Sequence, residues 1–311
     1  MELSVGRAVG KVILCGEHAV VYGRPALAVP VTQVRAEAVV EPGEPGAGLV
    51  LCAADLGEEV RLSAAESEHP LAVATRLALA HLGMAEPDWR VTIRSTIPVA
   101  SGLGSGAAVS AALVRSLASA VGRTLPPEDV SALAYEVEKL HHGTPSGIDN
   151  TVIAYEQPVY FVRDRPPEPF AIGSPFRLAI ADSGIRSPTR VAVGDVRRAW
   201  EQAPARYEGL FDQMAAAVEA ARIVIAEGRP AELGPLLDAN HLLLQEIGVS
   251  CERLDALAAA ARAAGALGAK LSGGGRGGNL IALVEDDTAE AVSVALRAAG
   301  AHRVILTSVG R

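Results

Sequence analysis

One stretch decides the fold: Pro98-Val-Ala-Ser-Gly-Leu-Gly-Ser-Gly-Ala-Ala108, a run of small residues. Before it, residues 89–97 alternate apolar and polar side chains, which is typical of a half-buried strand. After it, residues 109–121 carry an apolar side chain at every fourth position, which predicts a helix that ends at Gly122. The sequence therefore predicts a strand, a glycine-rich loop and a helix in direct succession.

This loop has the properties of an anion-binding site. Small residues let backbone amides approach a ligand closely, and the N-terminus of the following helix carries about half a positive charge. The alternative is a tight glycine turn without a ligand, and the loop alone leaves both open. Under the first interpretation the phosphate-binding residues are Ala100, Ser101, Gly102, Leu103, Gly104, Ser105, Gly106 and Ala107.

Other nucleotide-binding motifs do not fit the loop. The Walker pattern GxxxxGK[ST] is absent. Residues 102–107 satisfy the loose dinucleotide pattern GxGxxA, but that pattern requires an acidic residue about 20 positions further on, at the end of a strand. The acids near that distance, Glu128 and Asp129, follow two prolines at the start of a predicted helix. A dehydrogenase is therefore disfavoured.

The composition argues against several other classes of protein. The 311 residues are 50% hydrophobic and 21% charged, and their net charge of -8 comes without a basic run, which argues against nucleic-acid binding. Three cysteines without a CxxC pair argue against a disulfide framework or structural zinc. No segment has the pattern of a signal peptide or of a membrane span. We therefore expect a cytoplasmic protein without a nucleic-acid or membrane partner.

The rest of the chain alternates strands and helices, which predicts an α/β fold of two domains. Further strands are expected over residues 9–15, 26–40, 151–162, 176–181 and 303–308, with a strand and loop over 269–284. Helices are expected over residues 70–82, 126–142, 189–203, 210–228, 231–247, 251–264 and 288–299. The proline-rich residues 165–175 mark the expected boundary between domain 1–168 and domain 169–311.

Three more segments carry candidate chemistry. Residues 10–23 place a lysine, a glutamate and a histidine among apolar residues and glycines. Glu138 lies on the last turns of a predicted helix, and Asp149 follows after a Pro/Gly turn, so that the two carboxylates suit a metal or a hydroxyl group. Residues 270–279 form a second glycine loop. Each segment alone also has an ordinary interpretation, as a solvated lysine, loop polarity, a turn-capping pair or a glycine turn.

Together, these segments resemble the GHMP kinase superfamily, with its three motifs in the expected order over nearly the whole chain. Gly10-Lys-Val-Ile-Leu-Cys-Gly-Glu-His-Ala-Val-Val-Tyr-Gly-Arg-Pro-Ala-Leu-Ala28 is most similar to the mevalonate kinase family. His142-Gly-Thr-Pro-Ser-Gly-Ile-Asp-Asn150 is similar to the catalytic-aspartate segment of that family. The resemblance implies a GHMP kinase-type two-domain α/β fold with the active site in the interdomain cleft.

The resemblance also assigns roles to matching positions. Asp149 matches the catalytic aspartate that takes or orients the proton of the attacking hydroxyl. Lys11 matches the lysine that stabilises that oxygen and the neighbouring phosphate charge, and Glu138 matches the magnesium-binding glutamate. The implied substrate-lining residues are Lys11, Glu17, His18, Ser146, Asp149, Thr189, Gly273 and Gly274.

Two positions depart from the family pattern. Gly106 stands where the family loop commonly has a serine that contributes to metal binding, so that Ser105 or water would complete the magnesium shell. Arg276 stands in the third motif, where the family commonly has glycine. Its side chain either contacts a phosphate or the substrate carboxylate, or points to solvent, and the sequence leaves this open.

The implied reaction is the ATP- and Mg²⁺-dependent phosphorylation of (R)-mevalonate to 5-phosphomevalonate in isoprenoid synthesis. Sister activities stay open: phosphomevalonate kinase, mevalonate 3-kinase or a related decarboxylase. A phosphorylated substrate would need basic residues such as Arg186, Arg190 and Arg276. A non-catalytic sensor of ATP and metabolite is the rival from another class, and the presence of the predicted catalytic residues argues against it. A homodimer is a further expectation for a kinase domain of this size.

Overall fold

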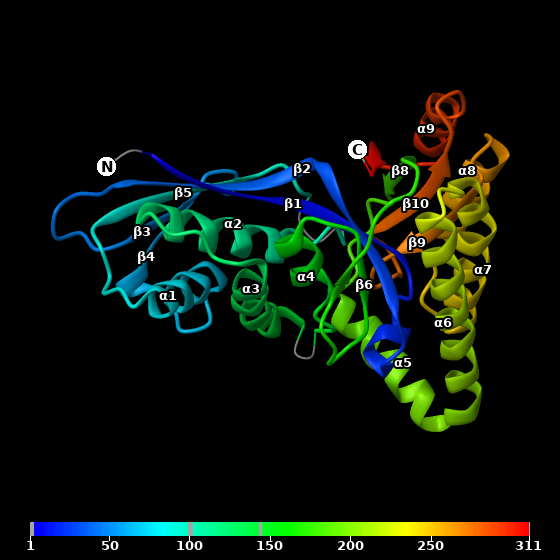
Figure 1. The fold of residues 1–311 in the computed structure, drawn as a ribbon, viewed down its shortest axis with the longest axis horizontal. Coiled ribbons are helices and arrows are strands. Elements are labelled where there is room, and N and C mark those ends of the chain that lie inside the picture. The colour runs from blue at the N-terminus through cyan, green and yellow to red at the C-terminus, as the bar shows by residue number, and fades with distance from the viewer. Residues whose placement is uncertain (1–2, 99–101, 143–144, 311) are drawn as a thin grey trace. The chain divides into compact units, whose positions relative to one another are not determined.

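The chain folds into two compact units (Figure 1). The computed structural model describes residues 3–98, 102–142 and 145–310. Of these, the first unit contains residues 3–10, 34–98, 104–142 and 145–156. The second unit contains residues 11–33, 102–103 and 157–310. Each unit has a sheet and helices, and each is described by itself.

The first unit places helices on one side of a sheet (Figure 1). Its strands are β1 (Ser4–Cys15), β2 (Ala26–Pro42), β3 (Val50–Ala53), β4 (Glu58–Arg61) and β5 (Trp89–Ser95), and a short 3-10 helix, η2, covers Leu62–Ala64. The strand order is β4-β3-β5-β2, and β1 also pairs with β2. Its helices are α1 (Pro70–Leu82), α2 (Ser105–Ala120), α3 (Pro127–His142) and α4 (Ile148–Tyr155). Strands β1 and β2 continue into the second unit.

Local sequence explains the helices of the first unit. Helix α1 covers the predicted residues, with Pro70 at its first position and Gly83 in the left-handed conformation after its end. Helix α2 follows the glycine loop and buries mainly alanine and leucine side chains. Because alanine is small, α1, α3 and α4 can all pack against α2. The predicted strand of residues 89–97 is confirmed as β5.

The prediction of a strand over residues 151–162 is wrong in its first half. Residues 148–155 form helix α4, and only β6 (Val159–Phe161) is a strand. Thr151, Val152 and Ile153 are β-branched but buried in α4, which packs against α2 and α3. An apolar run this short does not distinguish a buried strand from a buried helix. The short strands β3 and β4 were also not predicted.

The second unit has a four-stranded antiparallel sheet. Its strands are β8 (Phe176–Asp182), β9 (Gly268–Ser272), β10 (Asn279–Val284) and β11 (Arg303–Val309), in the order β11-β8-β10-β9. Strand β6 pairs with Ala26–Ala28 of β2 and with β7 (Glu168–Pro169). The helices of this unit are η1 (Ala19–Tyr22), α5 (Thr189–Gln202), α6 (Pro204–Ala226), η3 (Pro230–Glu232), α7 (Leu233–Glu246), α8 (Glu252–Ala263) and α9 (Ala289–Ala298). The predicted helices all occur, although α6 begins earlier than expected.

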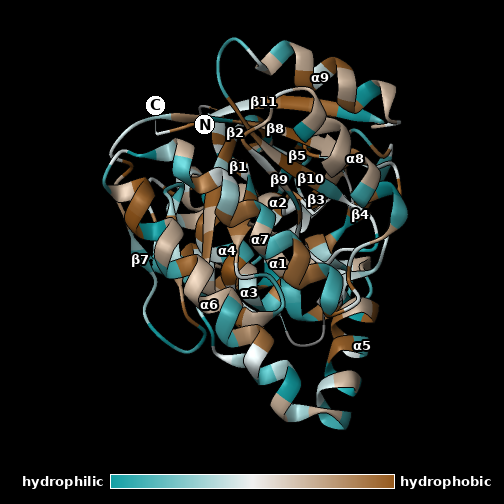
Figure 2. Ribbon diagram, turned by 90° about the vertical axis from the view of Figure 1, so that its right-hand side faces the viewer, coloured by the Kyte–Doolittle hydropathy of each residue, from teal (hydrophilic) through white to brown (hydrophobic). Residues whose placement is uncertain are grey.

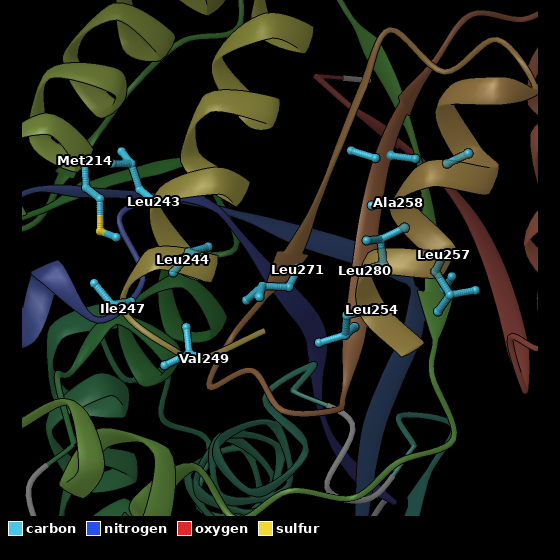
Figure 3. Packing of buried hydrophobic residues seen from close by; sticks show 14 of the residues in the cluster. Met214, Leu243, Leu244, Ile247, Val249, Leu254, Leu257, Ala258, Leu271 and Leu280 are labelled. Atoms are coloured by element: carbon cyan, nitrogen blue, oxygen red, sulfur yellow. The ribbon is translucent and has the colours of Figure 1, made fainter. Parts of the chain in front are cut away.

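Alternation along the strands builds the core of the second unit. Leu280 lies opposite Ala181 on one side and opposite Leu271 on the other, so that these three side chains share a face of the sheet. They belong to the buried cluster that the helices complete, and Figure 3 shows Leu271 and Leu280 beside residues of α8. Burying one leucine contributes about 1.5–3 kcal/mol. The same alternation directs Lys270 to the opposite face.

Helix α5 buries few side chains, since only Ala192 and Val196 are buried in it. Figure 2 shows hydrophilic and hydrophobic residues mixed along this helix.

Among the described residues, no helix is long and apolar enough to span a bilayer. The domain boundary predicted at residues 168 and 169 stays a prediction.

Two glycines allow α7 to pack closely on β9. A Cβ atom at Gly234 would lie 2.2 Å from the Leu267 carbonyl oxygen, and one at Gly268 would lie 2.1 Å from the Gly234 oxygen. Both distances are far below van der Waals contact, and the opposing atoms belong to the backbone. Helix and strand therefore require glycine at this crossing.

We predict that Gly234→Ala lowers the free energy of unfolding by about 1–3 kcal/mol, because the new methyl group overpacks the crossing. Gly209→Ala is the matched control. Gly209 is an exposed glycine inside α6 with open space at its Cβ position, so that alanine should raise the free energy by about 0.5–1 kcal/mol. Urea denaturation of both variants measures the difference. Equal stabilities would show that α7 and β9 do not approach as described.

Candidate active site

The end of β1 lies against β9 and α7 within the second unit. The Ile13 amide donates to Ser272 Oγ at 3.0 Å, and the same hydroxyl donates to the Ile13 carbonyl oxygen at 2.9 Å. The Gly16 amide donates to Asn240 Oδ1 at 3.2 Å. All of these groups are buried, so that the hydrogen bonds fix residues 13–16 on the sheet edge. Neither Ser272 nor Asn240 was among the predicted site residues.

Glu17 and Lys270 form a buried ion pair. Glu17 is 1% exposed and Lys270 is 0% exposed. The ammonium group of Lys270 donates to Glu17 Oε1 and to the carbonyl oxygen of Leu271. Lys270 begins the predicted second glycine loop of residues 270–279, but it was not among the predicted site residues.

His18 is held in a single tautomer. Its Nε2 lies 3.1 Å from the Gly274 carbonyl oxygen, which can only accept, so that Nε2 carries the proton and Nδ1 is left as an acceptor. Burial lowers the pKa of His18 to about 4, and the positive charges of Arg276 and Lys270 act in the same direction. His18 is therefore neutral at pH 7. Its φ of 61° lies in the left-handed region, where a non-glycine residue is strained.

The first motif is also anchored beyond His18. In η1, the ring of Tyr22 stacks on Phe211 of α6, with the centroids 4.4 Å apart, and lies 5.4 Å from Trp200 of α5. The ordinary interpretation of Lys11 as a solvated lysine is wrong, because only 2% of Lys11 is exposed. Its backbone amide donates to the Leu103 carbonyl oxygen at 3.0 Å. The first motif therefore contacts the predicted phosphate loop through its backbone.

Two glycine loops lie side by side in the second unit. A Cβ atom at Gly273 would lie 3.9 Å from Gly102 Cα, and one at Gly102 would lie 3.6 Å from the Ser272 carbonyl oxygen. Both glycines have positive φ angles, 84° for Gly102 and 94° for Gly273. Of the predicted loop residues, Ala100 and Ser101 lie outside the described residues.

The start of α5 packs on the third motif. A Cβ atom at Gly274 would lie only 2.8 Å from Thr189 Oγ1, so that both predicted substrate residues are neighbours. Arg276 forms an ion pair with Asp195 of α5, which lowers the pKa of Asp195. Its backbone amide donates to the Val249 carbonyl oxygen at 2.7 Å. The structure therefore gives Arg276 a protein partner, which differs from both predicted alternatives.

In the first unit, the N-terminus of α2 lies beside Glu138 of α3. Gly104 adopts a left-handed conformation with φ of 75°, and Ser105 is the first helical residue. Glu138 is buried, and its Oε1 lies 2.9 Å from the position of a Cβ atom at Gly106. The carboxylate therefore occupies the space into which a side chain at position 106 would extend. A side chain at position 106 would therefore shift the end of the Glu138 side chain.

Asp149 lies in the first turn of α4 and is half-buried. The preceding turn contains Ser146, whose Oγ accepts the Ile148 amide at 3.4 Å. Asn150 is buried, and its Nδ2 donates to the carbonyl oxygen of Ser131 at 3.1 Å and to its hydroxyl at 2.9 Å. Asn150 thus fixes α4 against α3. Because Asp149 is the adjacent residue of α4, these hydrogen bonds also fix the position of its backbone.

The predicted site residues fall into two sets. Lys11, Glu17, His18, Gly102, Leu103, Thr189, Gly273 and Gly274 belong to the second unit. Gly104, Ser105, Gly106, Ala107, Glu138, Ser146 and Asp149 belong to the first unit. The set in the second unit combines the two glycine loops with the buried side chains of Lys11 and Glu17, and the set in the first unit combines the N-terminus of α2 with the buried carboxylate of Glu138.

Family comparisons cover both halves of the chain. The GHMP kinases N terminal domain matches residues 69–157, and the GHMP kinases C terminal region matches residues 214–302. The chain belongs to the GHMP kinase family. The predicted family and its mixed α/β fold are confirmed.

Individual relatives narrow the position of this GHMP kinase within the family. It is 34% identical to a mevalonate kinase of Pyrococcus furiosus, over 99% of this chain and 96% of that protein. It resembles the crystal structure of L. major mevalonate kinase in complex with R-mevalonate, with a TM-score of 0.84 and 31% identity, over 99% and 96% of the two chains. A Streptococcus pneumoniae phosphomevalonate kinase shares the fold, with a TM-score of 0.83 and 16% identity, over 98% and 99% of the two chains. The expected phosphotransferase class is confirmed.

A second buried histidine lies near the site. Nδ1 of His241 accepts the Leu271 amide at 3.3 Å, and Nε2 lies 3.2 Å from Asp255 Oδ1. Burial, and then the charge of Lys270, lowers the pKa of His241 to about 4, although the Asp255 carboxylate acts in the opposite direction. His241 is therefore neutral in the folded protein at pH 7.

This pKa predicts a pH-dependent stability. Between pH 6.5 and pH 4 the unfolded chain binds a proton at His241 that the folded chain does not bind, so that stability falls as the pH falls. Above pH 6.5 the contribution vanishes. One such proton changes the free energy of unfolding by at most about 1.4 kcal/mol per pH unit.

His241→Asn should reduce this slope by one proton, because asparagine keeps an acceptor for the Leu271 amide without titrating. Chemical denaturation at pH 4.5, 5.5 and 7 measures the slope. His302→Asn, at an exposed histidine, is the matched control, and the slopes of the two variants are compared. An unchanged slope in His241→Asn would contradict the assignment.

Proposed function

We propose that this GHMP kinase transfers the terminal phosphoryl group of ATP to the 5-hydroxyl of (R)-mevalonate. The P. furiosus relative that matches it over nearly the full length is a mevalonate kinase. The L. major protein with the same fold was crystallised with R-mevalonate. The observation that carries the proposal is the first motif, whose Glu17 and His18 are buried and fixed beside the third motif.

The proposed chemistry follows from the residues of the chain. The 5-hydroxyl oxygen attacks the γ-phosphorus, the bond to the β–γ bridging oxygen breaks, and ADP leaves. Asp149 takes the hydroxyl proton, and Lys11 stabilises the attacking oxygen and nearby phosphate charge. The amides of residues 102–107 neutralise phosphate oxygens. In phosphoryl transfer these groups act mainly by positioning and charge neutralisation.

We further propose that Glu138 and Ser105 hold Mg²⁺. Magnesium prefers oxygen ligands and is commonly held by one or two carboxylates together with substrate phosphates and water. A buried carboxylate beside the N-terminus of α2 fits that requirement. No group of three or more His, Cys, Asp or Glu side chains suited to a metal occurs in the part of the chain that the structure describes. When bound, the ion neutralises charge on the phosphates of ATP.

Sister activities are the alternatives. A phosphorylated acceptor would require basic side chains at the site. Of the three arginines considered, Arg276 already pairs with Asp195, which leaves the exposed Arg186 and Arg190. This observation favours an unphosphorylated acceptor. The cytoplasmic location and the homodimer stay expectations.

The function is tested with purified protein, ATP, Mg²⁺ and (R)-mevalonate, with phosphorus NMR to locate the new phosphate ester. We expect 5-phosphomevalonate and ADP in equal amounts. Asp149→Asn should lower kcat by about 10²–10⁴-fold, because the base is lost. Its nucleotide affinity should stay close to that of the unaltered chain.

Asp164→Asn is the matched control for this substitution, because the Asp164 side chain is 91% exposed. It should leave kcat unchanged. Absence of 5-phosphomevalonate in the unaltered chain would overturn the proposed substrate. ATP turnover that does not depend on Asp149 would overturn the proposed base.

The contact between Gly106 and Glu138 gives a separate test of the metal site. Gly106→Ala places a methyl group at the Glu138 carboxylate, so that Mn²⁺ binding in the presence of ADP should weaken by about tenfold. Gly106→Ser adds a hydroxyl ligand at the same place and should bind Mn²⁺ more tightly than the alanine variant. Electron paramagnetic resonance measures free Mn²⁺ in both. Gly209→Ala is the control, and equal affinity in all variants would place the metal elsewhere.

A further inference from the structure

Strand β9 is an edge strand, and side chains close its outer edge. Asp238 Oδ1 accepts the Ala269 amide at 2.8 Å, and Arg262 donates to the Ala269 carbonyl oxygen at 2.8 Å. His241 accepts the Leu271 amide, and Lys270 donates to the Leu271 carbonyl oxygen. Four side chains thus satisfy backbone groups that an adjacent strand would otherwise bind.

Lys270 differs from the other three residues because it is completely buried. Moving an ammonium group into the protein interior costs several kcal/mol even after relaxation, so that a buried ion pair is weak evidence for a role in stability alone. A neutral side chain would fill the same volume at lower cost. The Glu17–Lys270 pair therefore requires another explanation, and its neighbours supply one.

Glu17 has an unused acceptor. Its Oε1 binds Lys270, whereas its Oε2 is buried and has no hydrogen-bond partner among the described residues. A buried carboxylate oxygen normally has a partner, and it can only accept. The partner must therefore be a donor such as a hydroxyl group or a water molecule.

The charge of Lys270 also acts on residues of the first motif. It acts on Cys15, His18 and His241, and the Glu17 carboxylate acts on Cys15. Burial raises the pKa of Cys15 to about 12, so that the thiol is neutral. Besides Glu17, the only carboxylate among the groups that shift these three pKa values is Asp255, which lies beside His241.

We propose that Lys270 is a positioning residue that acts through Glu17: its buried ammonium group holds the carboxylate so that Oε2 accepts a hydrogen bond from a hydroxyl of the acceptor substrate. The inference rests on the proposed function for the identity of the acceptor. The segment from Ile13 to His18 is then held at four points, of which only the Glu17 contact is ionic.

The central variant removes both charges. Lys270→Met alone leaves an unpaired buried carboxylate and is expected to destabilise the fold strongly. Lys270→Met combined with Glu17→Gln replaces the pair by neutral side chains of similar size, which should restore the melting temperature. If the role of the ion pair is only structural, this double variant should have the melting temperature and the activity of the unaltered chain.

A positioning role predicts a different outcome for the neutral pair. The KM for mevalonate should rise by about tenfold or more, as expected for a lost hydrogen bond to a charged group, while the KM for ATP changes little. Hydrogen exchange of the amides of residues 13–18 should quicken by about tenfold, because the ionic tie is absent. The exchange measurement does not depend on the identity of the substrate.

Asp238→Asn with Arg262→Gln is the matched control, because this half-buried pair holds the same strand from its outer edge. It should lower the melting temperature and leave the KM for mevalonate unchanged. If Lys270→Met combined with Glu17→Gln leaves both the KM for mevalonate and the hydrogen exchange of residues 13–18 unaltered, the positioning role is overturned. If the unaltered chain does not phosphorylate mevalonate, the proposed function fails, and the exchange of residues 13–18 still decides whether Lys270 fixes this segment.

Discussion

The structure of the second unit depends on the burial of polar groups from the first motif. A charge or a backbone group removed from water must find a partner, and the partners here lie on β9 and on α7. Ser272 ends β9, Asn240 lies on α7, and Lys270 lies within β9. The polar groups of the first motif meet these partners only in one alignment of the first motif with β9 and α7. The hydrogen bonds therefore specify the arrangement more than they stabilise it.

The glycine loops depend on the same alignment. Gly102 and Gly273 lie close together, since a Cβ atom at Gly273 would be in van der Waals contact with Gly102, 3.9 Å from its Cα. Both residues have positive φ angles, which glycine adopts more readily than any other residue. Backbone amides come close together only where side chains are absent. This is the physical basis for our proposal that a loop without a cationic side chain binds phosphate groups.

Two departures from the family pattern acquire a physical meaning in the structure. Gly106 leaves space for the carboxylate of Glu138, so that the missing hydroxyl and the position of the acid are coupled. Arg276 adopts a positive φ and binds Asp195, which ties the third motif to α5. Each departure has its compensating partner on a helix distant in sequence. A single sequence shows the departure, and only the fold shows the partner.

The sequence by itself determined the order of most elements, the glycine loops and the family, and it supplied the residues that we propose carry the chemistry. Hydrophobic periodicity and glycine positions are local properties, so that they can be read along the chain, as α1 and β5 demonstrate. Only the tertiary structure decided that residues 151–155 are helical, that Lys11 is buried, and that Lys270 pairs with Glu17 across more than 250 positions. Burial and charge pairing are properties of packed neighbours. They arise between elements that no local pattern relates.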